Sequence, residues 1–301
     1  AAGLVPYALG TDGGGSVRIP ASLTGLFGMK AQFARVPVYP TSATPTLAHV
    51  GPLARSVADA ADVLRVISGF DRRDPFSVAG ALSDETDAMP EKPLRIAYAP
   101  TLGYAKPNPD VAKLVAIAAS DIAALGHDVI EVAHVMDDPL DLWMSEFYAG
   151  AGTRLQATIQ DAPELIDPAV LDMLRPALSQ NMQDYYIKVF ERYALRDKMR
   201  QFFEDYDLLI SPTLPSAAFG VGLNAPPRWK EQNPIGWVAY TYPFNLTGQP
   251  AASVPVGFSD SGLPVGMQIV GPSHGEAAVL SLSAQYQTAH SILHIRPPLP
   301  A

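Results

Sequence analysis

Three consecutive glycines, at positions 13 to 15, lie between Asp12 and Ser16 near the start of the 301-residue sequence. Glycine permits positive φ angles and close backbone approach. A glycine turn after a strand can therefore aim several N–H groups at one point, where they bind an anion or a developing oxyanion. The hydroxyl of Ser16 is a candidate nucleophile for acyl transfer. Three interpretations follow: an anion site, an acyl-transfer site, or a simple turn that Ser16 caps.

The residues around the three glycines argue against a phosphate-binding loop. A P-loop requires a lysine just before its final serine or threonine, and no lysine follows these glycines. The dinucleotide-binding pattern G-x-G-x-x-G is not met by G-G-G-S either. An oxyanion hole beside a serine nucleophile and a plain glycine turn remain as alternatives, and in an arbitrary protein the plain turn would be favoured.

The composition narrows the classes of partner and chemistry. The net charge is -9, and the longest basic block, Arg72-Arg73, is flanked by aspartates, so nucleic acid is not expected as the main partner. No segment approaches the ~20 apolar residues that span a bilayer, and no signal peptide opens the chain, so no membrane partner is expected. The absence of cysteine excludes disulfides, thiolate metal ligands and a cysteine nucleophile from these residues, and it fits a cytoplasmic protein.

The segments next to the glycine run must position it. Residues 5–9 predict a buried strand that leads into the run. Pro20 suits the first turn of a short helix, which Gly25 can end. A clearer helix is predicted at residues 56–67, because Ser56 is a good N-cap and an apolar face follows it.

Further along the chain, strand and helix patterns alternate. Residues 94–99 and 128–132 predict strands, and residues 108–125 between them predict a helix, so the two strands are expected to be parallel. Residues 139–206 are mostly helical in pattern, and Pro176 is among the prolines expected to interrupt them. Three more strands and a last helix are predicted at residues 208–210, 251–256, 265–270 and 275–290.

The glycine run belongs to a longer recognisable segment, GTDGGGSVRIPAS, at residues 10–22. It resembles the core signature of the amidase signature family, written G-[ST]-D-x-G-G-S-[IV]-R-x-P-A. Residues 51–75, 244–257 and 262–271 resemble later blocks of that family, in the same order. The block at residues 28–36 departs from the family pattern G-x-K-P-[ST]-x-G-R-V at three positions. Ala31 stands in place of the proline, Gln32 in place of the serine or threonine, and Ala34 in place of the second glycine.

This resemblance implies an α/β fold in which a mixed β-sheet core is sandwiched by α-helices. It implies one amidase-signature domain over residues 1–301, with a variable helical region at about 139–206 that would set substrate choice. Tyr185, Tyr186, Trp229 and Trp237 are candidates for lining an apolar acyl pocket, although aromatic residues at such positions more often belong to a core.

The resemblance also implies a reaction and a set of site residues. Ser16 would be the nucleophile that cleaves a small-molecule carboxamide through an acyl-serine intermediate, giving a carboxylate plus ammonia or an amine. No metal and no organic cofactor is implied. The oxyanion hole would be formed by the backbone N–H groups of Gly13, Gly14, Gly15 and Ser16. The loop would be supported by the side chains of Thr11, Asp12 and Arg18.

The sequence does not contain the general base that the family uses for this reaction. In the family, a lysine acts through a second serine, and both lie upstream of the signature, the serine in a G-G-S-S-G-G segment that this sequence lacks. We therefore expect that the N-terminal part of the domain is missing, that an upstream segment of the same enzyme is a partner, and that this piece alone is inactive. His49 and Lys30 are the substitutes within the chain, but each is more readily explained as structural.

Two other functions remain open at this point. The A subunit of a glutamine-dependent tRNA amidotransferase shares the signature and would deliver ammonia to a partner protein, although residues 35–52 resemble free-standing bacterial amidases more. The chain could instead be an inactive truncated piece that folds without doing chemistry. The sequence also leaves open whether the protein is a homodimer.

Overall fold

The structure is a computed structural model that describes residues 1–80, 82, 92–230 and 233–297. Within these residues one mixed sheet is formed by eight strands, namely β1 (Tyr7–Asp12), β2 (Phe27–Lys30), β3 (His49–Ala54), β4 (Arg95–Tyr98), β5 (Asp128–Glu131), β6 (Leu208–Pro212), β7 (Ala251–Phe258) and β8 (Pro264–Val270). The strand order is β1-β3-β2-β7-β8-β6-β4-β5. Strand β4 is parallel to β5 and β6, and the remaining pairs are antiparallel. This arrangement confirms the expected mixed-sheet α/β class.

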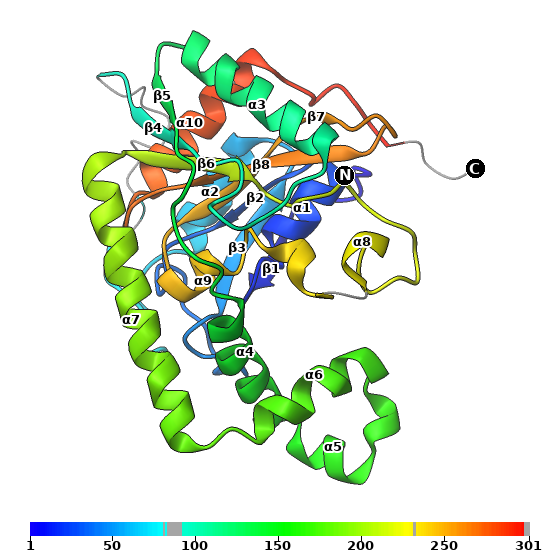
Figure 1. The fold of residues 1–301 in the computed structure, drawn as a ribbon. Coiled ribbons are helices and arrows are strands. Elements are labelled where there is room, and N and C mark those ends of the chain that lie inside the picture. Colours follow the sequence, from blue (N-terminus) through cyan, green and yellow to red (C-terminus); the bar gives the residue numbers. More distant parts are fainter. Residues whose placement is uncertain (81, 83–91, 231–232, 298–301) are drawn as a thin grey trace.

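Helices cover both faces of the sheet (Figure 1). One face packs against α2 (Val57–Ile67), α3 (Pro109–Ala124) and α10 (Glu276–Ala289), which share a hydrophobic core with alternate strand residues. The opposite face packs against α1 (Arg18–Thr24), α7 (Met182–Asp205) and α9 (Pro243–Thr247). Because successive side chains of a strand point to opposite faces, Ile96 joins the first core and Ala97 the second.

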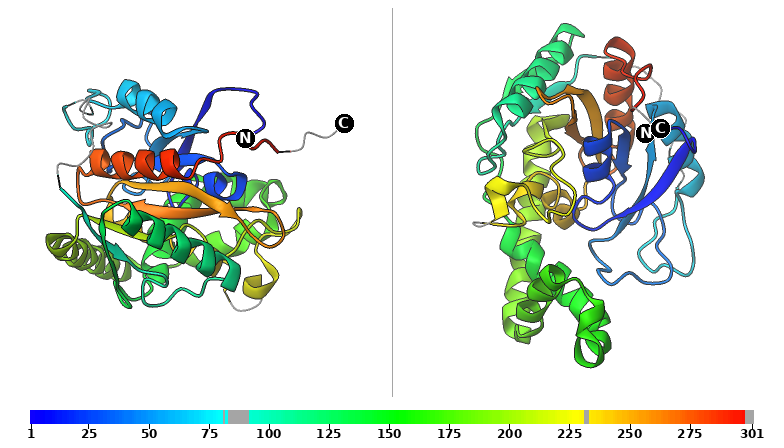
Figure 2. Two further views of the ribbon diagram at one scale, coloured as in Figure 1. Left: turned by 90° about the horizontal axis from the view of Figure 1, so that it is seen from above. Right: turned by 90° about the vertical axis from the view of Figure 1, so that its right-hand side faces the viewer.

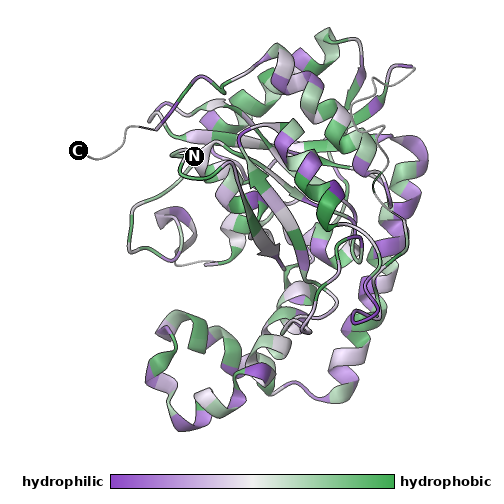
Figure 3. Ribbon diagram, turned by 180° about the vertical axis from the view of Figure 1, so that it is seen from behind, coloured by the Kyte–Doolittle hydropathy of each residue, from purple (hydrophilic) through white to green (hydrophobic). Residues whose placement is uncertain are grey.

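The region at 139–206 is helical, as predicted. It consists of α4 (Leu140–Arg154), α5 (Gln156–Asp161), the 3₁₀ turn Pro163–Leu165, α6 (Pro168–Leu178) and α7. Figures 1 and 2 show that α5 and α6 project away from the sheet, while α7 returns the chain to it. Figure 3 shows hydrophobic residues on this projecting arm as well as on the central strands. The remaining short elements are α8 (Pro227–Lys230) and the 3₁₀ turn Gly236–Val238.

Several local predictions are confirmed. Helix α2 begins after Ser56, whose hydroxyl accepts the N–H of Asp59 at 3.1 Å. Helix α1 ends at Gly25, which has a left-handed conformation with φ of 67°. The strand–helix–strand unit predicted at residues 94–132 is β4–α3–β5, with Arg95 opposite Asp128 in the parallel register.

Two local predictions are wrong. The first strand spans Tyr7–Asp12 and is mostly exposed rather than buried. Leu9, for example, is 52% exposed. The reason is its place at the edge of the sheet, where β3 is its only partner among the described strands. Pro176 does not interrupt a helix but lies inside α6, near its C-terminal end. There its missing N–H removes only one late hydrogen bond of the helix.

In the part of the chain that the structure describes, no helix combines the length and the apolar character needed to cross a bilayer.

Candidate active site

The glycine loop connects the end of β1 to the start of α1, and its backbone runs too close to other elements for larger residues. Gly15 has φ of 134°, and a Cβ added there would lie 2.5 Å from Oγ1 of Thr241. A Cβ added at Gly14 would lie 2.5 Å from the Cζ2 atom of Trp143 on α4. Both positions therefore require glycine for steric reasons, and Gly15 also for its backbone conformation.

The carbonyl groups of the loop are held by side chains from distant segments. The indole Nε1 of Trp143 donates to the carbonyl of Gly13 at 2.9 Å. The hydroxyl of Thr241 donates to the carbonyl of Gly14 at 2.7 Å. These two hydrogen bonds fix the rotation of the peptide planes that follow Gly13 and Gly14.

The N–H groups of the loop divide into two sets. Gly15 donates its N–H to Oδ1 of Asp12 at 2.7 Å, so this group is already committed within the protein. The N–H groups of Gly13, Gly14 and Ser16 have no acceptor among the residues that the structure describes. Of the four N–H groups expected at the oxyanion hole, three therefore lack a protein acceptor in the described structure, and the N–H of Gly15 has one.

Ser16 lies at the end of this loop and is exposed. Its hydroxyl has no hydrogen-bond partner within residues 1–80, 82, 92–230 and 233–297. A serine hydroxyl needs a nearby proton acceptor before it becomes a strong nucleophile. The described residues place Ser16 where a ligand can reach it, but they supply no base in hydrogen-bond contact with it.

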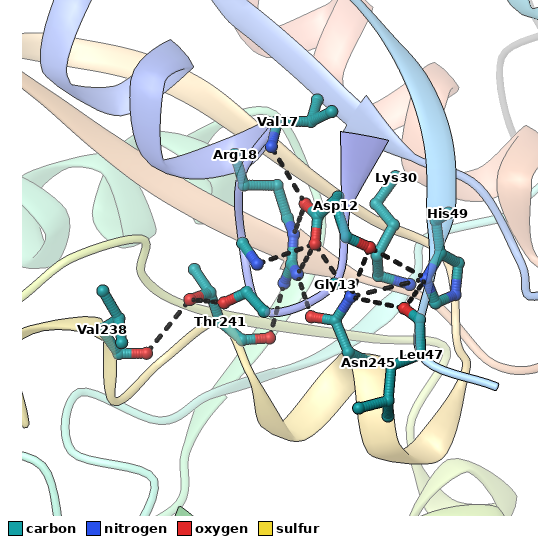
Figure 4. Close-up of polar contacts among 12 residues, drawn as sticks. Asp12, Gly13, Val17, Arg18, Lys30, Leu47, His49, Val238, Thr241 and Asn245 are labelled. Carbon is teal, nitrogen blue, oxygen red and sulfur yellow. Dashed lines mark hydrogen bonds and ion pairs between the residues drawn. The ribbon is translucent and has the colours of Figure 1, made fainter. Parts of the chain in front are cut away.

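Asp12 and Arg18 form a fully buried ion pair directly beneath the loop (Figure 4). Arg18 binds both oxygens of the carboxylate, with Nη2 2.9 Å from Oδ1 and Nε 3.0 Å from Oδ2. Burial by itself would raise the pKa of Asp12, but the charge and hydrogen bonds of Arg18, with smaller effects of Lys30 and Asn245, hold it well below its usual range. The carboxylate therefore stays ionised and bound to the loop.

Arg18 is also bound by groups from the C-terminal half of the chain. It donates to Oε1 of Gln268 at 2.8 Å, to Oδ1 of Asn245 at 2.7 Å and to the carbonyl of Thr241 at 2.9 Å. Sequence reasoning missed these three residues as parts of the site. Asn245 and Gln268 lie in two of the recognised C-terminal blocks, and that was the only signal that could have pointed to them.

The other residues predicted from the sequence lie outside the hydrogen-bond network of Asp12 and Arg18 or at its edge. Thr11 is exposed on β1, opposite Val50, and its side chain has no hydrogen-bond partner in the described part of the chain. Lys30 is fully buried at the end of β2, where its ammonium donates to the backbone carbonyl of Gln249. Burial, with the positive charge of Arg18, lowers the pKa of Lys30 well below its usual value.

His49 is buried beside Asp12 and has a structural hydrogen bond. Its Nδ1 donates to the carbonyl of Leu47 at 2.7 Å. Burial, together with the nearby charge of Lys30, lowers the pKa of His49 well below its usual value, so the imidazole is neutral at pH 7. The described hydrogen bonds of Lys30 and His49 do not include Ser16, so neither is in position to take its proton directly.

Comparisons with known sequences agree with the signature. A family model described as Amidase matches residues 1–280. The chain is 32% identical to an acylamidase from Rhodococcus erythropolis over 297 residues, which cover 95% of this chain and 62% of that protein. It is 30% identical to the A subunit of glutamyl-tRNA(Gln) amidotransferase from Synechococcus sp. (strain RCC307), over 100% of this chain and 67% of that one. The chain thus spans about two thirds of the length of these relatives.

Solved structures with similar folds cover nearly all of this chain. A bacterial aryl acylamidase of the amidase signature family superposes with a TM-score of 0.85 and 29% identity, over 98% of this chain and 66% of that one. A 6-aminohexanoate cyclic dimer hydrolase superposes with a TM-score of 0.87 and 27% identity over the same shares of the two chains. The family match over residues 1–280 shows that this chain belongs to the amidase signature family, and the glycine loop and the buried Asp12–Arg18 pair agree with that assignment.

Proposed function

We propose that the protein containing this chain is an amide hydrolase whose nucleophile is Ser16. In the first step the Oγ of Ser16 bonds to the carbonyl carbon of the amide while a base takes the hydroxyl proton. The C–N bond then breaks, and the nitrogen leaves as ammonia or an amine after it receives a proton. Water hydrolyses the resulting acyl-serine ester, which releases a carboxylate and restores Ser16.

The observation that carries this proposal is the set of unpaired donors around an exposed serine. The N–H groups of Gly13, Gly14 and Ser16 lack protein acceptors in the described structure. Directed at the carbonyl oxygen of a substrate, they would stabilise the negative charge that develops there by a few kcal/mol. In this proposal Gly15 shapes the loop rather than donating to the oxyanion. Asp12 and Arg18 support the loop from below, and for Thr11 the same supporting role stays a prediction.

The base in this proposal comes from outside the described chain. The family resemblance supplies a lysine and a second serine upstream of the signature, and the unpartnered hydroxyl of Ser16 is consistent with that source. An upstream segment of the same enzyme is therefore the partner that we propose first. A small-molecule amide as substrate, a cytoplasmic location and a homodimer remain predictions at the same level.

The test is to label the complete enzyme with a serine-directed fluorophosphonate. We expect covalent labelling at Ser16 and loss of amide turnover in Ser16→Ala. As a matched control, Ser120→Ala changes an exposed serine on α3 whose hydroxyl only bonds the carbonyl of Ala116, and turnover should be unchanged. Labelling at another serine, or full turnover by Ser16→Ala, would show that the assignment is wrong.

A second candidate function is supported by one relative in particular. The glutamyl-tRNA(Gln) amidotransferase chain from Synechococcus aligns with all of this chain. If this protein has that role, the enzyme should hydrolyse glutamine and should copurify with a second protein when it is isolated from its source. An enzyme that purifies alone and prefers other amides would instead favour the free-standing amidase.

A further inference from the structure

A pocket of about 440 Å³ is bordered by four segments: the residues after β2, helix α7, the end of α9 and the turn after β8. Its lining includes Gln32 and, from α7, Arg196. Gln32 is one of the three departures from the family pattern, where a serine or threonine stands. The pocket therefore differs in chemistry from what that pattern predicts.

The side-chain amide of Gln32 has one end bound and one end free. Its Oε1 accepts the backbone N–H of His274 at 3.3 Å, which fixes which end of the amide is oxygen. The nitrogen, Nε2, has no hydrogen-bond partner among the described residues, and it is not shielded from solvent. Gln32 thus leaves an amide donor within reach of a ligand.

Arg196 leaves most of its guanidinium free as well. Its Nε donates to the carbonyl of Leu246 at 3.1 Å, which ties the side chain to the end of α9. Its Nη1 and Nη2 have no hydrogen-bond partner in the described part of the chain, and both reach solvent. The free edge of this guanidinium can therefore bind both oxygens of a carboxylate.

The free donors of Gln32 and Arg196 lie beside the same point. Gly248 ends α9 with a φ of 84°, so its position favours glycine. A Cβ added there would lie 3.8 Å from Nε2 of Gln32 and 3.9 Å from Nη2 of Arg196. Two donors from distant parts of the sequence thus border the space that the glycine leaves open.

The negative charges around this point are already paired. Asp197 is the carboxylate in the lining, and Arg200 binds it at 2.8 Å. Glu276, whose Oε1 accepts the backbone N–H of Gln32, is fully buried and pairs with Arg35 at 3.1 Å. Within the described residues Arg196 has no carboxylate partner, so the pocket presents one unpaired positive charge.

Aromatic side chains form another part of the lining. Phe33 and Tyr193 both border the pocket. The Cβ of Phe33 lies 3.2 Å from the point where a Cβ of Gly248 would be, and the guanidinium carbon of Arg196 lies 5.6 Å from the centre of the Tyr193 ring. The donors are therefore flanked by rings on which an apolar group can pack.

We propose that this pocket binds a small organic carboxylate. The carboxylate accepts hydrogen bonds from the Nη groups of Arg196 and from Nε2 of Gln32, and its apolar part lies against Phe33 and Tyr193. A single negative charge suits the site, because it balances the one unpaired cation of the lining. No residue of the glycine loop lines this pocket, so the proposal does not depend on the reaction proposed for Ser16.

The test measures binding to the complete enzyme by ligand-detected NMR titration. The probes are benzoate, nitrobenzene, which has nearly the same shape but no net charge, and inorganic phosphate. We expect benzoate to bind at least about tenfold more tightly than nitrobenzene, as charge-assisted hydrogen bonds imply. Phosphate should bind more weakly than benzoate, because it has no apolar part.

A pair of matched arginine variants locates the binding. Arg196→Gln removes the unpaired charge and should weaken benzoate binding by about tenfold or more. Arg228→Gln removes an arginine outside the pocket, which donates to the side chain of Asn108, and should leave the affinity unchanged.

Gln32→Glu tests the same site without a change in α7. The new carboxylate keeps an acceptor for the N–H of His274 and places its other oxygen beside Arg196, where it competes with the ligand. Benzoate binding should be lost while the variant stays folded, as thermal melting followed by circular dichroism checks for each variant. Equal binding of benzoate and nitrobenzene, tighter binding of phosphate, or unchanged benzoate binding in Arg196→Gln or Gln32→Glu would each overturn the proposal. Turnover is not measured, so these results are independent of whether Ser16 is the nucleophile.

Discussion

Asp12 holds the glycine loop through hydrogen bonds from backbone and side-chain donors, and one substitution tests how much stability depends on its charge. Asp12→Asn keeps the size of the side chain but leaves the fully buried guanidinium of Arg18 without a counter-ion. We expect the free energy of unfolding to fall by about 3–5 kcal/mol, as when one partner of a buried ion pair is removed. Urea denaturation of the two proteins measures this difference.

The control for this prediction is the same change at an exposed ion pair. Asp71 pairs with Arg73 at the surface, where an ion pair contributes little. Asp71→Asn should therefore change the unfolding free energy much less than Asp12→Asn. Equal effects of the two substitutions would mean that the buried pair has no special role in the stability of the loop.

His49 makes stability depend on pH in a defined direction. Its pKa in the folded protein lies well below the value of about 6.5 for an unfolded chain. The unfolded state therefore binds more protons in this range, so the free energy of unfolding decreases as the pH falls below about 6.5. His49→Asn removes the titration, and the Asn amide can still donate to the carbonyl of Leu47. We expect the variant to show a weaker loss of stability between about pH 7.5 and 5.5 in urea titrations, whereas an unchanged slope would exclude His49 as the source.

Asp12 contributes to the same acid sensitivity at lower pH. Its folded pKa is depressed below the unfolded value of about 3.9. The stabilisation by its ionised form is therefore present above about pH 4 and is lost as the pH falls toward the folded pKa. The effect of His49 begins at a higher pH than the effect of Asp12, so measurements between about pH 6.5 and 4 report on His49 without a contribution from Asp12.

At the scale of elements, the turn from β1 into α1 was predictable because its signals are local. The glycines, Pro20 and Gly25 lie within one short stretch, and each acts on its own backbone. The contacts that fix the turn were not predictable in the same way. Trp143 and Thr241 reach the loop from residues more than a hundred positions away, and nothing in their own sequence neighbourhood indicates these partners.

The close approach of the loop to the rest of the fold leads to a prediction about Gly15. Gly15→Ala would force a Cβ to within 2.5 Å of Thr241, on a backbone with φ of 134°. Gly69→Ala has a similar φ of 128° but open space around its Cβ, so it carries the backbone penalty alone. We expect Gly15→Ala to lower the melting temperature clearly more than Gly69→Ala. Equal shifts would show that backbone strain accounts for the whole effect and that packing against Thr241 contributes nothing.

At the scale of the whole molecule, the fold class and most strands followed from the sequence, but the position of each strand in the sheet did not. Periodicity marks which residues are apolar, whereas the order of strands depends on pairings between distant segments. The error at β1 has this origin. An apolar run beside a glycine turn predicts burial, yet the strand lies at an edge, with Tyr7 and Leu9 about half exposed. Local patterns carry no information about which strands remain without a neighbour.

The last prediction concerns the activity of residues 1–301 when they are expressed alone. Ser16 has donors around it but no base in hydrogen-bond contact within the described residues. An oxyanion hole without a working base retains only a small part of the catalytic rate. The chain aligns with 62% of the acylamidase from Rhodococcus, and the family resemblance places the lysine and the second serine upstream. We therefore expect the isolated chain to be nearly silent toward aryl and aliphatic amides, while a longer protein that includes the upstream segment turns them over.

The assay compares the two proteins at equal concentrations of folded material. The exposed edge of β1 offers unpaired backbone groups, which favour association with other chains. For that reason light scattering should accompany the activity measurement, so that aggregation is not mistaken for missing chemistry. If the isolated, monodisperse chain matched the longer protein in turnover, the base would lie within these residues. His49 and Lys30 would then be the first side chains to replace, since they are the buried titratable groups nearest in sequence to the glycine loop after Asp12 and Arg18.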